Sequence, residues 1–305
     1  MTPWYPTAKR FSVNGKLSLF HRFGPLLALW ILITAGPLQA APLVLAVHPY
    51  ASAADIEKRF SPLVKKLSSD IGLSVVLRIS PDYEGHIEAL GEQRVDIAYI
   101  GPAEWLITEA RYGRRPLLGK VIFEGRQGLS GHLVTRQPMT TPASQTNAAL
   151  STLRGQRIAF VDNKSTMGYL VPMAVLKRAG VREQDFHSSK FVGNHENVAM
   201  GVLAGEFQAG AIKDETYEKY KAQGLYSLYQ MPTVPEHIFV ASPRVPAEWQ
   251  ALIQRSLFSM AETPEGKVAL QAIRPDLSKI SSVTEQDFSA LRTLLGMPAG
   301  RAKAQ

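Results

Sequence analysis

Residues 43–47, Leu-Val-Leu-Ala-Val, form a continuous apolar run, which is typical of a strand buried on both faces of a sheet. The next segment, 52–70, carries apolar side chains every three or four residues from Ile56 to Leu67, and this spacing predicts a helix. Residues 73–79 are rich in β-branched side chains and predict a second strand. Strand, helix and strand in this order predict a βαβ unit and therefore a parallel pair of strands.

The same alternation of strands and helices continues to the end of the chain. Two strands, 117–123 and 129–135, are close enough in sequence to form a hairpin, and the rest of the pattern favours largely parallel sheets. The other strands are expected at 95–100, 157–161, 186–192, 207–212 and 237–241. Helices are expected at 82–90, around Trp105 and Ala110, and at 166–179, 196–205, 215–223, 248–260, 265–273 and 285–295.

A polar stretch between Gln137 and Ala149, rich in Pro, Ser and Thr, is the best candidate for a linker. It separates two α/β units, so we expect an α/β protein of two lobes with a ligand cleft between them. The strand at 237–241 is predicted to return the chain to the first lobe. The predicted boundaries are 41–140 and 238–305 for lobe 1, and 141–237 for lobe 2.

The first forty residues have the features of a secretory signal peptide. Four basic and no acidic residues precede the apolar run 26–35, which ends at Gly36-Pro37 and is followed by small residues. The alternative is a transmembrane anchor, but a span needs roughly twenty apolar residues and this run is much shorter. We expect cleavage after Ala40 and a mature protein in the periplasm.

Composition excludes several classes of function. The chain has no cysteine, which excludes disulfide scaffolds, thiolate metal sites and cysteine nucleophiles. Without the signal peptide the net charge falls from +8 to +4, because 30 basic residues then face 26 acidic ones. No basic stripe with aromatic partners is present, so nucleic-acid binding is not expected. No pair of histidines has metal-ligand spacing on a helix, so neither a metal site nor a cofactor is expected.

Polar side chains lie where several predicted strands end, and ligands of open α/β proteins bind at such ends. Ser165 and Thr166 follow the strand at 157–161, and His195 follows the strand at 186–192. Two hydroxyls at the positive end of a helix suit an oxyanion, although Ser and Thr are also ordinary helix caps. The imidazole of His195 could donate to the same anion, although a histidine near a cap is also a common surface residue.

Tyr83, Tyr99 and Glu215 are weaker candidates of the same kind. A phenol can complete an oxyanion site, but most tyrosines simply pack. Glu215 lies at the start of a predicted helix, where its charge suits the helix dipole.

The order and spacing of these segments resemble those of one family, the periplasmic solute receptors of phosphonate, phosphite and phosphate ABC importers. The resemblance covers about residues 43–270, and its most specific segment is 165–172, Ser-Thr-Met-Gly-Tyr-Leu-Val-Pro. The segments 81–85 (Pro-Asp-Tyr-Glu-Gly), 95–101 (Val-Asp-Ile-Ala-Tyr-Ile-Gly) and His195-Glu196 also carry it.

The resemblance implies a two-lobed, hinge-closing receptor with the type II, or Venus-flytrap, fold. It implies that Ser165 and Thr166 hold the oxygens of the phosphorus anion, that His195 donates from the opposite helix, and that Tyr83 contributes from the first lobe. It also implies a monomer whose partners are the permease and ATPase of an importer.

The chain departs from the family pattern at several positions. Met167 replaces a second serine after the Ser-Thr pair, and Ile100 replaces a tyrosine of some members, with Tyr99 one position away. Members that bind aminophosphonates hold the ammonium with two carboxylates. Glu215 matches one of them, whereas His237 stands at the position of the other. We therefore expect Tyr99, Glu215 and His237 to border the site, and a ligand without an ammonium group.

The predicted function is capture of a phosphorus oxyanion or organophosphonate for delivery to an ABC importer. A periplasmic sensor that reports a ligand to a membrane kinase or chemoreceptor is the alternative, and the sequence does not separate the two. An enzyme is not expected, because no Gly-x-Ser-x-Gly turn surrounds Ser165.

Overall fold

The computed structural model describes residues 41–137 and 146–298. The predicted signal peptide and the central part of the predicted linker lie outside the described residues. Among the residues described, no helix is both long enough and apolar enough to cross a membrane.

The first of two sheets has six strands in the order β11-β4-β10-β3-β1-β2. Only β2, β1 and β3 run parallel, and β10, β4 and β11 add antiparallel pairings. Its strands are β1 (Leu43–Val47), β2 (Val75–Ile79), β3 (Ile97–Ile100), β4 (Leu117–Phe123), β10 (Ile238–Ala241) and β11 (Leu277–Ser281). Its helices are α1 (Ala53–Ile71), α2 (Tyr83–Gly91), α3 (Pro102–Tyr112), α8 (Ala247–Ser259), α9 (Pro264–Ile273) and α10 (Ser289–Leu295).

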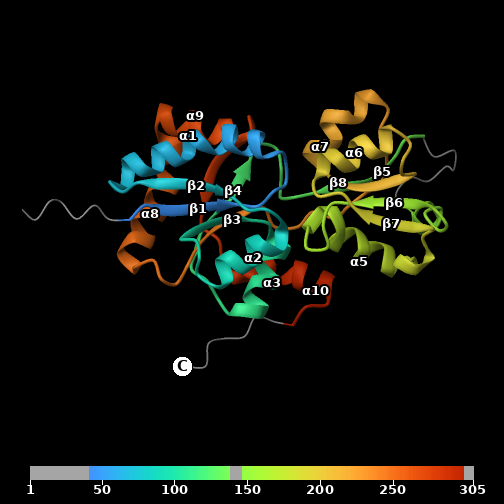
Figure 1. Cartoon of the computed structure of the whole chain (residues 1–305), viewed down its shortest axis with the longest axis horizontal. Helices are drawn as coiled ribbons and strands as arrows, with labels where there is room; N and C mark the ends of the chain where they lie inside the picture. Colours follow the sequence, from blue (N-terminus) through green and yellow to red (C-terminus); the bar gives the residue numbers. More distant parts are fainter. Residues whose placement is uncertain (1–40, 138–145, 299–305) are drawn as a thin grey trace, which may run out of the picture. The chain divides into compact units, whose positions relative to one another are not determined.

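Strand β1 is buried on both faces, as its apolar run predicts. Leu45 and Val47 pack in a cluster with α1, α8 and α9, whereas Ala46 between them packs in a cluster with α2, α3 and α10. Figure 1 shows α1 and α9 on one side of this sheet and α2 and α3 on the other. The side-chain period of two in a strand explains why one short run serves both layers.

The second sheet has five strands in the order β7-β6-β8-β5-β9, of which β7, β6 and β8 are parallel. Helix α5 covers one of its faces, and α6 and α7 cover the other (Figure 1). Its strands are β5 (Gly131–Thr135), β6 (Arg157–Phe160), β7 (Ser188–Phe191), β8 (Ala209–Lys213) and β9 (Tyr226–Gln230). Its helices are α4 (Asn147–Ser151), the π-helical turn η1 (Thr166–Leu170), α5 (Val171–Arg178), α6 (His195–Leu203) and α7 (Asp214–Tyr220). Four short 3₁₀ turns are η2 (Glu183–Asp185), η3 (Lys221–Gln223), η4 (Met260–Glu262) and η5 (Glu285–Phe288).

The predicted hairpin of 117–123 and 129–135 is wrong, because β4 and β5 belong to different sheets. Strand β5 is almost wholly buried and lies between β8 and β9, so the second sheet supplies both of its neighbours. The chain therefore leaves the first sheet before β5, earlier than the predicted boundary at 140. The sheets are also mixed and not largely parallel. The predicted return of 237–241 to the first lobe is confirmed, since β10 pairs with β3 and β4.

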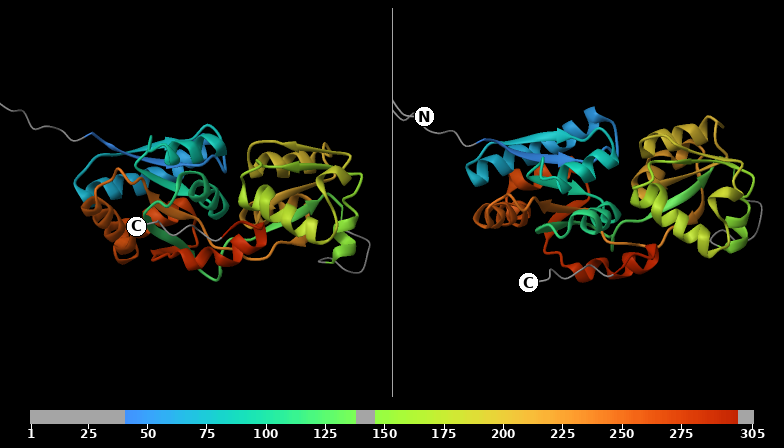
Figure 2. Two further views of the ribbon diagram at one scale, coloured as in Figure 1. Left: turned by 90° about the horizontal axis from the view of Figure 1, so that it is seen from below. Right: turned by 60° about the horizontal axis from the view of Figure 1, so that its bottom comes forward.

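The two segments that cross between the sheets are hydrogen-bonded to each other. Leu129 and Val234 form an isolated antiparallel bridge in which each N–H lies 2.9 Å from the other's carbonyl oxygen. Gly128 permits this approach, because a Cβ there would lie 2.3 Å from the Val234 carbonyl oxygen. Figure 2 shows these crossing segments from two further directions. The connection between the lobes is thus a paired two-strand link.

Candidate ligand site

The seven side chains predicted from the sequence line two adjoining pockets between the lobes. We call the first, of about 10 Å³, the hydroxyl pocket and the second, of about 20 Å³, the charged pocket. The hydroxyl pocket is lined by His48, Tyr50, Tyr83, Glu104, Leu129, Ser165, Thr166, Met167, His195, Lys213 and His237. The charged pocket is lined by Tyr50, Arg59, Tyr99, Phe123, Leu129, Lys213, Glu215, Glu236, His237, Ile273 and Arg274.

Ser165 and Thr166 are buried, and each hydroxyl oxygen accepts a hydrogen bond from a backbone N–H. Ser165 Oγ caps its own turn by accepting from Gly168 N at 3.2 Å. Thr166 Oγ1 accepts from Ala103 N at 3.1 Å, which joins η1 to the start of α3 in the other lobe. A hydroxyl that accepts still has its O–H to donate. The two residues therefore offer two donors to an acceptor in the pocket.

Pro172 lies in the first turn of α5, directly after the turn that carries these hydroxyls. A residue at this position would normally donate its N–H to the Gly168 carbonyl oxygen four residues earlier. Proline has no N–H. The Gly168 carbonyl instead accepts from Val161 N at 3.2 Å, which attaches the turn to the end of β6. The missing N–H of Pro172 therefore leaves the Gly168 carbonyl free to accept from Val161.

His195 presents a defined tautomer to the hydroxyl pocket. Its Nδ1 accepts from Lys213 N at 3.1 Å, so the proton of the neutral ring lies on Nε2. Burial, with the charge of Lys213 added, lowers the pKa of His195 well below its usual value. His195 is therefore a neutral donor through Nε2–H.

His48 and Tyr83 also bring buried polar atoms to this pocket. His48 Nε2 has no hydrogen-bond partner among the described residues, and the Tyr83 hydroxyl has none of ordinary geometry, although it lies close to Ser165. Burial, and next the charge of Glu104, raises the pKa of Tyr83, so the phenol keeps its proton. Because buried polar groups are nearly always satisfied in folded proteins, these atoms point to a ligand that satisfies them.

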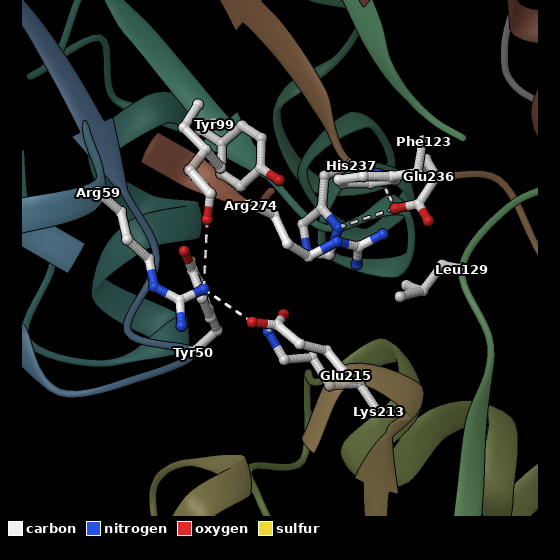
Figure 3. A pocket seen from close by; sticks show the side chains of 11 residues that line it. Tyr50, Arg59, Tyr99, Phe123, Leu129, Lys213, Glu215, Glu236, His237 and Arg274 are labelled. Carbon is white, nitrogen blue, oxygen red and sulfur yellow. Dashed lines mark hydrogen bonds and ion pairs between the residues drawn. The ribbon is translucent and has the colours of Figure 1, made fainter. Parts of the chain in front are cut away.

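An ion-pair cluster dominates the charged pocket (Figure 3). Glu215 Oε1 lies 2.8 Å from Arg59 Nη1 of the other lobe, and Glu215 Oε2 lies 2.8 Å from Lys213 Nζ. Burial alone would raise the pKa of Glu215, but Lys213 and Arg59 lower it well below its usual range. Lys213 Nζ also lies 4.1 Å from the centre of the Tyr50 ring. The position of Glu215 at the start of a helix is therefore not its only role, because its two oxygens pair with Arg59 and Lys213.

Tyr99 and His237 form one wall of the charged pocket (Figure 3). Their rings are stacked with centroids 5.1 Å apart and planes 6° from parallel. His237 Nδ1 lies 3.4 Å from Glu236 Oε2. His237 lines both pockets and Tyr99 lines the charged one. Their contact with a ligand stays a prediction.

Several lining residues were not predicted from the sequence. His48 and Tyr50 follow β1, and the rule about strand ends would have found them. Arg59 on α1 and Arg274 after α9 follow no strand, and only the tertiary arrangement brings them to the pocket. Within 41–137 and 146–298, no group of three or more His, Asp or Glu side chains could hold a metal ion.

Comparisons of the chain with a family model and with known proteins agree on one family. A family model described as "ABC transporter, phosphonate, periplasmic substrate-binding protein" matches residues 45–288. The chain is 28% identical over 187 residues to the phosphate-import protein PhnD of Mycolicibacterium smegmatis, a match that covers 58% of this chain and 56% of that one. It is 22% identical over 229 residues to the phosphonates-binding periplasmic protein of Escherichia coli, covering 73% of this chain and 67% of that one. The chain thus spans little more than half the length of the mycobacterial relative.

The fold is also found among solved structures. PhnD1 from Prochlorococcus marinus, solved in complex with methylphosphonate, superposes with a TM-score of 0.75 at 16% identity. That match covers 83% of this chain and 96% of the other. At this identity the comparison supports the two-lobed fold and not the ligand.

Proposed function

The chain belongs to the family of periplasmic substrate-binding proteins of phosphonate ABC transporters, and on that premise we propose that it captures a phosphorus oxyanion or organophosphonate. It would act in the periplasm after removal of the predicted signal peptide, as a monomer that delivers its ligand to the permease and ATPase of an importer. The observation that carries the proposal is the convergence of spare donors on the hydroxyl pocket. Ser165, Thr166 and His195 each have an acceptor engaged by a backbone N–H and a donor left over.

Such a donor set favours an acceptor-rich anion, because hydrogen bonds to a charged group are worth about 1.5–3 kcal/mol each. It disfavours catalysis by Ser165. A serine nucleophile needs a base that can take its proton. His195 cannot serve as that base, because its Nδ1 holds Lys213 N–H and its Nε2 already carries the proton. We therefore propose binding without turnover.

The charged pocket supports a ligand that lacks an ammonium group. Both oxygens of Glu215 are engaged by Arg59 and Lys213. His237 supplies no negative charge where aminophosphonate receptors of the family are expected to have a carboxylate. A ligand ammonium would meet Arg59, Lys213 and Arg274 in this pocket, with Glu215 already paired and Glu236 as the other carboxylate of the lining.

The test is binding of phosphate, phosphite, methylphosphonate, 2-aminoethylphosphonate and sulfate to the purified protein, measured by thermal shift and calorimetry. A phosphorus anion at a hundredfold excess over its Kd should stabilise the protein by about 2.7 kcal/mol. Ser165→Ala and Thr166→Ala should each weaken its binding by about 1–3 kcal/mol.

A matched control is available in the same lobe. Ser151 and Thr152 are also adjacent, but their hydroxyls bond to backbone carbonyls of α4, away from both pockets. The double variant Ser151→Ala/Thr152→Ala should retain full affinity. Unchanged affinity in Ser165→Ala/Thr166→Ala would refute the placement of the site, and no binding of any phosphorus anion would refute the function.

A further inference from the structure

Glu104 brings an unpartnered carboxylate oxygen to the hydroxyl pocket. Its Oε2 accepts from Gly101 N at 3.0 Å and lies 2.6 Å from His48 Nδ1. Its Oε1 is buried and has no hydrogen-bond partner within the described part of the chain. Leaving such an atom unsatisfied is costly, so a bound ligand is expected to complete it.

The Glu104 carboxyl group and the Thr166 hydroxyl both lie near Gly101. A Cβ built on Gly101 would lie 2.7 Å from Glu104 Oε2, 3.3 Å from Thr166 Oγ1 and 3.6 Å from His48 Cε1. Three groups from three separate elements therefore converge on one point. An oxyanion that accepts from Thr166 lies within reach of Glu104.

An oxygen of the ligand and an oxygen of a carboxyl group can form a hydrogen bond only if one of them carries a proton. We propose that Glu104, positioned by His48, binds the phosphorus oxyanion together with one shared proton and thereby discriminates against sulfonates. A hydrogen phosphonate brings this proton itself. A sulfonate has none at neutral pH, so the protein must supply it. The inference rests on the proposed function and adds a selectivity to it.

The surroundings of Glu104 determine the pH at which it loses this proton. Burial raises the pKa of Glu104 to about 7, opposed by His86, the Gly101 N–H and His237 and assisted by Asp162. Burial also lowers the pKa of His48 well below its usual value, so that ring is neutral. The titratable groups that face Glu104 are His48 after β1, Tyr83 and His86 on α2, Asp162 after β6, and His237 before β10.

The pH determines whether Glu104 can donate a proton to a bound anion. Below about pH 7 Glu104 holds the proton and can donate it to any oxyanion. Above about pH 7 the carboxylate repels an anion that brings no proton. Affinity for a sulfonate should therefore fall as the pH rises, by up to about tenfold per pH unit for one linked proton.

Methylphosphonate and methanesulfonate are the probes, since they differ mainly in the proton that only the first can carry. At pH 8 we expect the wild-type protein to prefer methylphosphonate by about 10- to 100-fold, the usual effect of one unsatisfied buried group. In Glu104→Gln the amide can donate to either anion, so the preference should shrink to within about threefold. Glu109→Gln, a buried carboxylate on the same helix that pairs with Arg114 and Arg292, is the control and should keep the wild-type preference.

A second measurement covers the case in which Glu104→Gln does not fold. Calorimetry of wild-type protein with methanesulfonate from pH 6 to pH 8.5 should show affinity that falls above about pH 7. A flat profile, a wild-type preference near one at pH 8, or an unchanged preference in folded Glu104→Gln would each overturn the inference. These results differ from failure of the proposed function, in which methylphosphonate, phosphite and phosphate all fail to bind the wild-type protein.

Discussion

Backbone N–H groups orient three polar side chains of the hydroxyl pocket, Ser165 and His195 within their own lobe and Thr166 from the other lobe. Ser165, Thr166 and His195 each accept from a backbone N–H, and Lys213 supplies one of those N–H groups from the end of β8. The ligand therefore meets oriented donors that lose little freedom on binding. Pre-organisation of this kind improves affinity without adding contacts.

Arg59 occupies one oxygen of Glu215, so that this oxygen is not available to a charged substituent of the ligand. We expect methylphosphonate to bind the wild-type protein at least about tenfold more tightly than 2-aminoethylphosphonate, a difference of about 1.4 kcal/mol. Arg59→Ala frees Glu215 Oε1 and should reduce this preference, as measured by calorimetry with both ligands. Arg244→Ala, whose partner Asp96 lies away from the pockets, is the control and should not change the preference. A wild-type protein that prefers 2-aminoethylphosphonate would contradict the argument.

Side chains differ in how far the sequence could predict their part in the site. Ser165, Thr166 and His195 follow strands, and a local rule places them at one sheet edge. Glu104 lies in the first turn of α3, where a carboxylate is ordinary, and its neighbour His48 is distant in sequence. Its unpartnered oxygen could be recognised only once the lobes and their hydrogen bonds were known.

At the scale of the element, the turn before α5 is packed tightly against β6. A Cβ on Gly168 would lie 2.4 Å from Val161 Cβ and 2.7 Å from Ser165 Oγ. Gly168→Ala should therefore destabilise the fold by about 1–3 kcal/mol, measured by urea denaturation, and weaken methylphosphonate binding by displacing Ser165. Tyr169→Phe, which removes only an exposed bond to Glu183, should leave the affinity unchanged. Full affinity in Gly168→Ala would show that the turn is not needed for binding.

The strands that sequence patterns did not predict, β9 and β11, are edge strands, and the short helix α4 was also not predicted. Strands β9 and β11 each lie at the end of a sheet, and β9 buries only Leu228 fully along its length. Both strands face solvent over much of their length, so their apolar patterns are weak, whereas the edge strands β2 and β7 were predicted. The interior strands β1, β3 and β8 were predicted because burial on both faces requires a continuous apolar run.

At the scale of the whole molecule, the two lobes are joined by the Leu129–Val234 bridge and by contacts across the site. Thr166 accepts from Ala103 N, and Lys164 Nζ lies 2.7 Å from Glu84 Oε2. These protein contacts and the contacts of a ligand between the lobes therefore both favour the arrangement in which the lobes lie close together. A ligand shifts such an equilibrium only by its difference in affinity for the two arrangements.

The Lys164–Glu84 pair allows this coupling to be tested away from the ligand, because neither residue lines a pocket. Lys164→Gln should favour separation of the lobes and weaken methylphosphonate binding by up to about fivefold, since a partly exposed ion pair contributes about 0.2–1 kcal/mol. Calorimetry gives the affinity, and small-angle scattering should show a larger radius of gyration without ligand. Lys221→Gln removes an ion pair with Glu218 within one lobe and is the control, with both quantities expected to stay at wild-type values. If Lys164→Gln matches that control, the Lys164–Glu84 contact between the lobes does not contribute to affinity.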